Sequence, residues 1–298
     1  ERNLDGMEIE ASGGYLTLTV CSPRIIRIKV WDKEADPPRP NPAVPERSWE
    51  PVRFEVVRSE DHLIISTFRL KMRIWNSPLR IDLLNAEGEP VNLDKGGIKF
   101  EGGVTKISRE AGEEERFFGF GLQFHSFEHR GKLRFLKVTA DPKEDNGQSH
   151  VVVPFYLSTA GYGLFLNTHT YSLFEMATEE HPREIIISVP GGSMDLFMIY
   201  GPSPREIVSG YLEITGAPAV PGKWGLGFWY RVKSGWNCKK VKEVLEKFRS
   251  KGIPCDVVGL EPSWQTHAYP CTYVWNADHF PDPDSFVRWL HDNGFKLN

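Results

Sequence analysis

The first 200 residues contain many short segments rich in β-branched and aromatic residues, and this pattern constrains the fold more than any other feature. Several of the segments alternate apolar and polar residues, as half-buried strands do. Turn signals separate them, for example Thr-Ala-Gly at 159–161 and Pro-Gly-Gly at 190–192. Many strands with almost no helical stretch predict an antiparallel β-sandwich. The clearest predicted strands are 15–20, 25–30, 62–66, 68–74, 151–156, 163–167, 184–189 and 193–200.

The pattern changes near Pro202, where strands and helices begin to alternate. A helix is predicted over 203–214 and a hinge over 218–221. Strands are then expected at 224–230, at 256–260 and from Phe295 onward, with helices at 239–250 and 282–294 between them. Asn237 and Asp282 are the expected N-caps of these two helices. Alternating strands and helices indicate a parallel sheet.

Two and a half β/α units do not close a barrel, nor do they bury both faces of a parallel sheet. We therefore expect this chain to be the front part of a longer protein, with part of the α/β domain following Asn298.

Composition narrows the functional classes only slightly. The 298 residues include 40% hydrophobic and 26% charged residues, close to the average of globular proteins. A net charge of −4 argues against a nucleic-acid binder. The four cysteines form no CxxC pair, so a zinc ribbon is not expected. No apolar run is long enough for a membrane helix and no secretory signal is visible, which leaves the compartment open.

The segment from Asp256 to Pro283 carries the strongest functional signal. A short apolar strand ends at the carboxylate of Glu261, and about twenty residues rich in Trp, Tyr and His follow without a helical or alternating period. Loops between strand and helix usually have about 2–6 residues, so one of this length is typically functional. A carboxylate and aromatic rings at the carboxyl end of a parallel strand favour an active site that binds a sugar.

Six segments in order give the chain a resemblance to a known family. They include FGFGLQF at 118–124, PFYLS at 154–158 followed by GYGLF at 161–165, and FMIYGP at 197–202. PGKWGLGFW at 221–229, IPCD at 253–256 and FPDP at 280–283 complete the series. Together they resemble glycoside hydrolase family 31, the retaining α-glycosidases that include α-glucosidases and α-xylosidases.

This resemblance implies a galactose-mutarotase-like β-sandwich followed by a (β/α)8 barrel. The expected domains are a sandwich at 1–201, a helical linker at 202–221 and the beginning of the barrel at 222–298. The family's nucleophilic and acid/base Asp residues belong to later barrel strands, so we assign no catalytic residue in this chain. The implied activity is exo-acting hydrolysis of terminal α-glucosides, α-xylosides or α-galactosides. No metal or organic cofactor is expected, because both halves of that reaction use carboxylates.

Glu261 aligns with a family position that commonly holds an Asp, a ligand of sugar hydroxyls. Its carboxylate could accept hydrogen bonds from two adjacent hydroxyls, or it could simply pair with a Lys or Arg at the strand end. Glu is one methylene longer than Asp, and this departure from the family pattern opens a galactose-type or N-acetylated sugar as an alternative to the family's default glucose.

Six other residues are predicted to contact the substrate, each with a structural alternative. The Trp264 ring could stack on a sugar or pack in the loop. Trp229 is expected as a pocket wall. Polar contacts are expected from Gln265, His267 and Arg231, with a surface salt bridge as the alternative for Arg231. The aromatic lid is expected to be Phe124. Phe124 is expected in a sandwich loop that leans over the barrel mouth, as in the family.

Other motifs have simpler interpretations. The HSFEH segment at 125–129 lacks the HExxH order and a helical pattern, so no zinc site is predicted. The GFG at 119–121 and the GYG at 161–163 are expected to form tight turns. The Pro-rich residues 37–45 are expected to form an extended surface segment that carries no chemistry.

Two functions from other classes remain as alternatives. One is a carbohydrate-binding module without hydrolytic activity. The other is a hexose mutarotase, which would leave the segment after Pro221 unexplained. The partner expected for the leading function is an oligosaccharide or glycoside substrate. The sequence does not specify whether the protein forms a homo-oligomer.

Overall fold

The computed structural model describes the chain except for residues 1, 4–5, 12, 46–48 and 268–270. It divides into two compact units, residues 1–217 and 218–298, which are described separately. The aromatic loop therefore contains three residues, 268–270, outside the described part of the chain.

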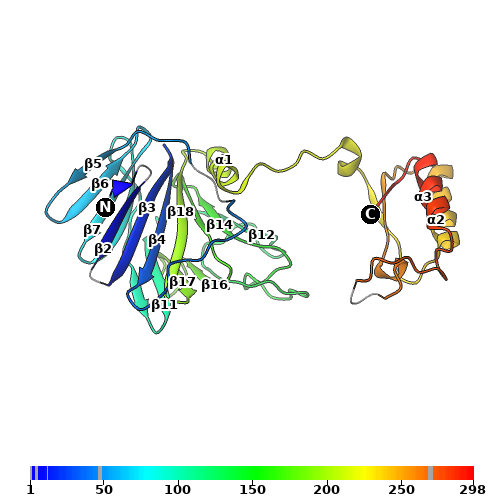
Figure 1. Cartoon of the computed structure of the whole chain (residues 1–298), viewed down its shortest axis with the longest axis horizontal. Helices are drawn as coiled ribbons and strands as arrows, with labels where there is room; N and C mark the ends of the chain where they lie inside the picture. The colour runs from blue at the N-terminus through cyan, green and yellow to red at the C-terminus, as the bar shows by residue number, and fades with distance from the viewer. Residues whose placement is uncertain (1, 4–5, 12, 46–48, 268–270) are drawn as a thin grey trace. The chain divides into compact units, whose positions relative to one another are not determined.

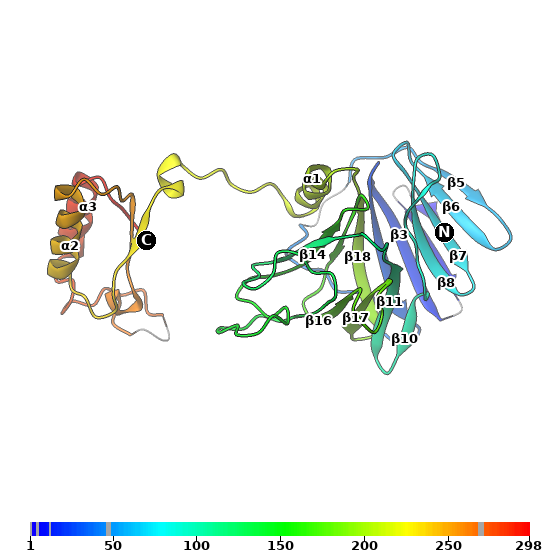
Figure 2. The same ribbon diagram turned by 180° about the vertical axis from the view of Figure 1, so that it is seen from behind.

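The first unit contains three antiparallel sheets (Figures 1 and 2). The eight-stranded sheet has the order β1-β2-β3-β4-β18-β15-β14-β12. Its strands are β1 (Arg2–Asn3), β2 (Gly6–Ala11), β3 (Gly14–Ser22), β4 (Ile25–Asp32), β12 (Phe117–Gly121), β14 (Val152–Ser158), β15 (Tyr162–Leu166) and β18 (Ser193–Tyr200).

Two five-stranded sheets complete this unit, with the orders β5-β6-β7-β8-β9 and β10-β11-β17-β16-β13. The first contains β5 (Glu55–Arg58), β6 (His62–Ser66), β7 (Leu70–Asn76), β8 (Leu79–Asn85) and β9 (Pro90–Asn92). The second contains β10 (Lys99–Glu101), β11 (Val104–Glu110), β13 (Lys132–Leu136), β16 (Ser172–Met176) and β17 (Glu184–Pro190).

One hydrophobic core joins the three sheets and confirms the predicted sandwich. Ile28 of β4, Met72 of β7 and Ile187 of β17 are all buried in this core. On β4, Ile26, Ile28 and Val30 are buried, and Arg27 and Lys29, which alternate with them, are less buried. The period of two predicted from the sequence therefore directs one side of each strand into a shared interior.

Helix α1 (Pro204–Thr215) covers the other face of the eight-stranded sheet. It begins where the sequence predicts, with Ser203 as the N-cap that accepts a hydrogen bond from the Glu206 N–H and with Pro204 in the first turn. Ile207 and Ile214 pack with Phe165 and Ile199 of the sheet in a second core. The segment expected as a linker thus contributes a helix to the packing of the first unit.

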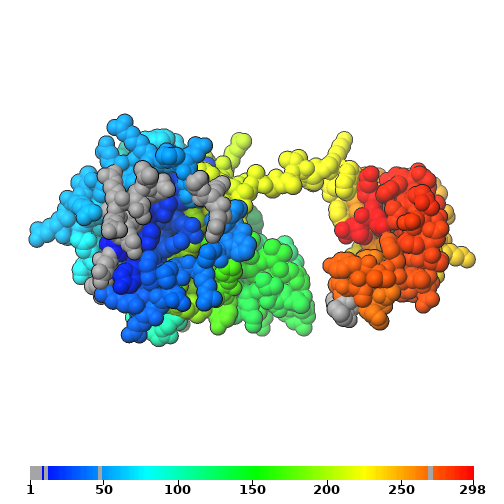
Figure 3. All heavy atoms as spheres, viewed as in Figure 1, coloured from blue at the N-terminus to red at the C-terminus, as the bar shows by residue number. Residues whose placement is uncertain are grey.

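The second unit has a parallel sheet of β19 (Trp229–Arg231), β20 (Val257–Gly259) and β21 (Lys296–Leu297). Helices α2 (Cys238–Ser250) and α3 (Pro283–Asp292) lie side by side on one face of it (Figures 1 and 2). In the space-filling view, the red C-terminal residues form part of this unit's surface (Figure 3). Val241, Leu245, Phe286 and Leu290 point from the helices into the core, as their spacing predicts.

The first predicted strand of this unit is shorter than expected. Residues 223–226 form the 3-10 helix η1 (Lys223–Leu226), and only Trp229–Arg231 pairs with β20. Three glycines in the stretch 222–227 remove the side chains that would favour a strand, which explains the difference. A second 3-10 helix, η2 (Pro262–Trp264), follows β20. No described helix is long and apolar enough to span a bilayer.

The N-cap of α3 provides a local test of this unit. The Asp282 carboxylate accepts a hydrogen bond of 2.9 Å from the Ser285 N–H. We expect Asp282→Ala to destabilise the start of α3 by about 0.5–2 kcal/mol. Hydrogen exchange of the Ser285 amide should accelerate, and Asp278→Ala, an exposed change outside the helix, should leave it unchanged.

Candidate functional site

The candidate site lies at the carboxyl ends of β19 and β20. Because these strands are parallel, Arg231 at the end of β19 and Glu261 just after β20 reach the same edge of the sheet. The Arg231 Nε donates to Glu261 Oε1. The Glu261 side chain is 18% exposed and that of Arg231 is 76% exposed. The carboxylate is thus largely enclosed, whereas the guanidinium can turn into solvent.

The structure therefore shows an ion pair, which was the structural alternative to substrate contact for both Glu261 and Arg231. An ion pair with so exposed a partner contributes about 0–1 kcal/mol to stability, because water screens it. Its small contribution leaves Glu261 available for another partner. Substrate contact by Glu261 and Arg231 stays a prediction.

Aromatic residues that follow Glu261 form a packed layer. The ring centroids of Trp264 and Trp275 lie 5.0 Å apart, with an angle of 68° between the ring planes. The centroids of Trp275 and Phe280 lie 5.4 Å apart. Trp264 is half-buried against the core of this unit. Packing, the structural alternative for Trp264, therefore fixes its orientation, and stacking on a sugar stays a prediction.

Gln265 and His267 lie in different environments. Gln265 is buried, and its Oε1 accepts a hydrogen bond of 3.0 Å from the Tyr273 N–H, which ties the two sides of the aromatic loop together. His267 is exposed and directly precedes the residues that are not described. The structure assigns Gln265 a role in shaping the loop, and direct contact with a sugar is a prediction for both side chains.

Trp229 and Phe124 are both partly exposed aromatic residues. The Trp229 side chain lies in β19, with 47% of the residue exposed, and its Nε1 donates to the Gly225 carbonyl at 3.0 Å. Phe124 belongs to the first unit, follows β12, and meets the His150 ring edge-on at 5.8 Å. The predicted roles of Trp229 as a wall and of Phe124 as a lid stay predictions.

The HSFEH segment has structural roles. Glu128 Oε1 accepts hydrogen bonds from the Phe117 and Arg130 N–H groups at 3.3 and 2.7 Å. His129 is 1% exposed, and its Nε2 lies 3.3 Å from the Gly119 carbonyl oxygen. Within the described residues, no group of three His, Cys, Asp or Glu residues is placed to hold a metal ion.

His129 makes the stability of the first unit depend on pH. Burial, and then the positive charge of Arg134, lower the pKa of His129 from 6.5 to about 4. Between these values the unfolded chain binds the proton and the folded chain does not, so the free energy of unfolding should decrease as the pH falls from 6.5 towards 4. When the free energy of unfolding is measured by urea titration at several pH values in this range, it should depend less on pH in His129→Gln than in the unaltered chain. A curve equally steep in His129→Gln and in the exposed control His125→Gln would contradict this assignment.

The sequence gives no indication of the polar cluster beside His129. Arg134 of β13 is fully buried and donates to Asp145 Oδ1 at 2.6 Å, and Lys132 and Ser126 also donate to Asp145. These bonds lower the pKa of the Asp145 carboxyl despite the opposing effect of its burial. They hold the loop 141–148, which has no regular pattern, against the sheet. A strand Arg normally signals an exposed position, so only the fold shows that Arg134 is inside.

Comparison with known families assigns both units. The model of the "Glycosyl hydrolase 31 N-terminal galactose mutarotase-like domain" matches residues 15–175, more than half of the chain. The model of the "Glycosyl hydrolases family 31 TIM-barrel domain" matches residues 218–298. The expected order of a mutarotase-like sandwich and the beginning of a barrel is thereby confirmed.

Curated relatives include two α-xylosidases. That of Lactiplantibacillus pentosus is 30% identical over 192 residues, covering 62% of this chain and 24% of that protein. That of Saccharolobus solfataricus is 28% identical over 249 residues, covering 74% of this chain and 32% of the relative. The chain therefore spans about a quarter to a third of the length of these relatives.

Solved structures share the fold over the whole chain. The Flavobacterium johnsoniae family 31 dextranase, complexed with isomaltotriose, has a TM-score of 0.86 at 22% identity, covering 100% of this chain and 38% of that one. A family 31 α-xylosidase from a soil metagenome, complexed with xylose, has a TM-score of 0.81 at 16% identity, covering 100% and 46%. The two family matches, in this order and over these residues, establish that the chain belongs to glycoside hydrolase family 31.

Proposed function

We propose that the natural polypeptide carrying this sequence is a retaining, exo-acting α-glycosidase that hydrolyses terminal α-linked glucosides, xylosides or galactosides. The observation that supports this most is the enclosed Glu261 carboxylate at the carboxyl end of a parallel strand. That end of the strands is where barrel enzymes bind their substrates. The names of the relatives, α-xylosidases and α-glucosidases among them, agree with this class of substrate.

In this proposal Glu261 binds and orients the sugar. An ionised carboxylate accepts from two hydroxyls at once, and such charge-assisted bonds are about twice as strong as neutral ones. Arg231 pairs with the carboxylate in the absence of sugar and turns aside when the sugar enters, since its own side chain is mostly in solvent. The packed rings of Trp264 and Trp275 hold the backbone that follows Glu261 in place.

The bond-breaking step needs two further carboxylates about 5–5.5 Å apart, one attacking the anomeric carbon and one protonating the leaving oxygen. We place these on barrel strands that the relatives carry outside the region matched by this chain. Glu261 is then a substrate-positioning group, and no residue of this sequence forms the glycosyl intermediate.

A panel of p-nitrophenyl α-glycosides, tested on the natural polypeptide, decides the proposal. Release of p-nitrophenol from at least one α-glucoside, α-xyloside or α-galactoside, with retention of the anomeric configuration by NMR, is the expected result. Saturable sugar binding without cleavage would instead assign a carbohydrate-binding function. Anomer interconversion of a free hexose without cleavage would assign a mutarotase.

Glu261→Gln tests the positioning role. The loss of one charge-assisted pair of hydrogen bonds should lower kcat/KM by about 10- to 100-fold, since such bonds contribute about 1.5–3 kcal/mol. Glu246→Gln, an exposed change of the same type on α2, serves as the matched control and should leave kcat/KM unchanged. Equal kcat/KM in Glu261→Gln and the unaltered enzyme would show that Glu261 does not contact the substrate.

A further inference from the structure

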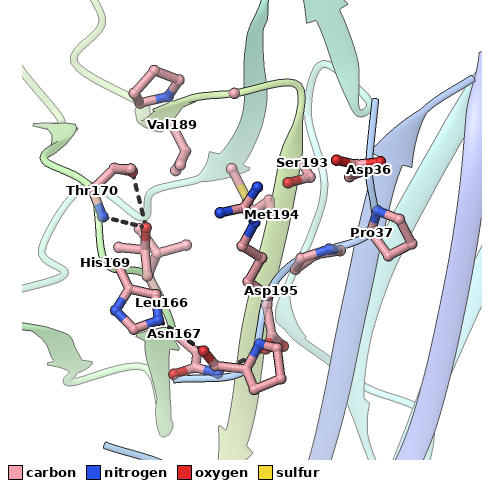
Figure 4. Close-up of a pocket in the computed structure, with 16 residues that line it drawn as sticks. Asp36, Pro37, Leu166, Asn167, His169, Thr170, Val189, Ser193, Met194 and Asp195 are labelled. Carbon is pink, nitrogen blue, oxygen red and sulfur yellow. Dashed lines mark hydrogen bonds between the residues drawn. The ribbon is translucent and has the colours of Figure 1, made fainter. Parts of the chain in front are cut away.

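A pocket of about 560 Å³ lies in the first unit, formed by three segments that are far apart in the sequence (Figure 4). The Pro-rich strap Asp36–Pro40 is one wall, and residues 166–170 at the end of β15 form the second. The third wall comes from the connection between β17 and β18, at residues 189–191 and 193–195. Its volume is in the range of small-molecule sites, about 300–1,000 Å³. The first unit contributes all of its lining residues.

The strap is fixed at both ends. Before it, the Asp32 N–H donates to the Gly192 carbonyl at 2.9 Å. After it, the His169 Nε2 donates to the Pro40 carbonyl at 2.8 Å, and the Asn41 Nδ2 donates to the Thr168 carbonyl at 3.2 Å. Three of its five residues are prolines with a fixed φ. A wall that is rigid before binding loses little conformational entropy when a ligand enters.

Two lining residues, Asn167 and Asp195, belong to a neutralised polar network. Asp195 is 2% exposed and accepts from Arg27 Nε and Nη2 at 2.9 and 2.6 Å. Asn167 Nδ2 donates at 2.7 Å to Asp195 Oδ2, the oxygen that also accepts from Arg27 Nη2. Because a carboxylate only accepts, this bond fixes the orientation of the Asn167 amide.

The fixed amide leaves one acceptor unused. Asn167 is 4% exposed, and its Oδ1 has no hydrogen-bond partner among the described residues. An unpaired buried polar group costs about 1–3 kcal/mol, so a hydroxyl donor that reached this oxygen would bind favourably. The feature points to a ligand that carries O–H groups.

The remaining walls combine apolar and hydroxyl groups. Pro37 of the strap contributes exposed apolar surface, whereas Leu166 and Met194 are buried behind the lining, and Figure 4 shows the three around the same hollow as the Ser193 hydroxyl. The hydroxyls of Thr168 and Thr170 lie 3.0 Å from each other on the second wall. At the strap, Asp36 and Arg39 carry opposite charges, so the lining selects neither anions nor cations.

We propose that this pocket is a saccharide-binding site formed by the sandwich unit, with a neutral mono- to trisaccharide as its ligand. Apolar walls match the C–H faces of a pyranose ring, and the hydroxyl-lined wall with the Asn167 amide matches its edge. The site assigns to the Pro-rich strap a binding role beyond the proposed hydrolysis, and it does not depend on that activity.

Titration of the isotope-labelled 298-residue chain with isomaltotriose, maltotriose and methyl α-xyloside, followed by backbone amide NMR, tests this site. We expect saturable shifts at Arg39, Asn167–Thr170 and Ser193 for at least one probe. Thr170→Trp places an indole at the exposed rim and should weaken this binding at least about 10-fold, equivalent to about 1.4 kcal/mol. Ser59→Trp, an exposed change elsewhere on the same unit, should change it less than about 2-fold.

The outcomes separate this site from the barrel edge. Shifts near Thr170 that persist in Glu261→Gln support the pocket, even where the glycoside panel shows no cleavage. Absence of shifts at the pocket amides with all three probes would overturn the proposal. Equal affinity in Thr170→Trp and the unaltered chain would overturn it as well, whereas shifts confined to Arg231 and Glu261 would assign all sugar binding to the second unit.

Discussion

Arg109→Met is expected to lower the free energy of unfolding of the first unit by about 3–5 kcal/mol, the loss that follows removal of one partner of a buried ion pair. Arg109 lies on β11 and is 2% exposed. Its Nε donates to Asn92 Oδ1 at 2.6 Å, its Nη2 to the Asn92 carbonyl at 2.8 Å, and its Nη1 lies 3.5 Å from Asp94 Oδ2. Methionine fills a similar volume, so the change removes mainly the charge and the donors.

The negative charge of Asp94 explains the size of this effect. Burial raises the pKa of the Asp94 carboxyl, and the Arg109 charge opposes the rise. Without Arg109, the carboxylate must be buried unpaired or take up a proton. A raised folded-state pKa favours the folded form at low pH and loses this contribution as the pH rises through it. The deficit of Arg109→Met should therefore be largest near neutral pH and shrink as the pH falls.

Urea unfolding of three variants tests whether the unpaired Asp94 charge causes the loss of stability. Arg109→Met combined with Asp94→Asn removes both charges, and the loss should shrink to about 1–3 kcal/mol, the cost of buried polar groups left unsatisfied. Arg58→Met, an exposed change on β5, should cost less than about 0.5 kcal/mol. If the double variant were no more stable than Arg109→Met alone, the unpaired Asp94 charge would not be the cause.

Gly119→Ala is the second change with a large expected effect. Gly119 lies in β12 at the irregularity of its pairing with β14, with a φ of 141°. A Cβ there would lie 2.3 Å from the Phe155 carbonyl oxygen and 2.9 Å from the Tyr156 Cα, which are backbone atoms that cannot turn aside. Backbone strain and overpacking each cost about 1–3 kcal/mol, so we expect a total loss of roughly 2–6 kcal/mol.

Gly102→Ala is the matched control for Gly119→Ala. Gly102 also has a positive φ, 59°, but no atom lies within 4 Å of the position that its Cβ would occupy. The free energy of unfolding of Gly102→Ala should therefore fall by only about 1–2 kcal/mol, the cost of the left-handed backbone conformation for a residue with a Cβ. Thermal unfolding followed by near-UV circular dichroism compares the two, and similar losses would show that the contact with β14 does not matter.

The glycine pairs also show where prediction from the sequence was wrong. GYG at 161–163 begins in a turn, where the Gly161 N–H donates to the Ser158 carbonyl. GFG at 119–121, predicted as another tight turn, is instead a bulged part of strand β12. Phe120, between the glycines, has a φ of 65° and is buried against His129 and Phe174. Contacts with distant strands stabilise a conformation that local propensity disfavours.

Local patterns predicted eight strands of the first unit and the three helices, and they missed other strands, β8 and β11 among them. The alternation in 25–30 and 184–189 corresponds to β4 and β17, and the predicted caps Asn237 and Asp282 begin α2 and α3. Ser203, predicted as the first residue of a helix, is the N-cap of α1. These signals are readable because a strand or a helix cap depends on residues that are neighbours in the chain. The position of Glu261 at the end of a parallel strand follows from the same reasoning, since β/α alternation fixes the strand direction.

Residue order by itself determined eight of the sandwich strands, the three helices with the caps Asn237 and Asp282, and the carboxylate at a barrel edge, because each depends on a period or a spacing of a few residues. Only the tertiary structure decided that Arg109 and Arg134 are inside, that three sheets share one core, and that the Pro-rich strap faces Asn167. Asn167 is more than 120 residues from Pro40, and a burial or a pocket wall that joins such distant segments depends on packing, which has no local pattern.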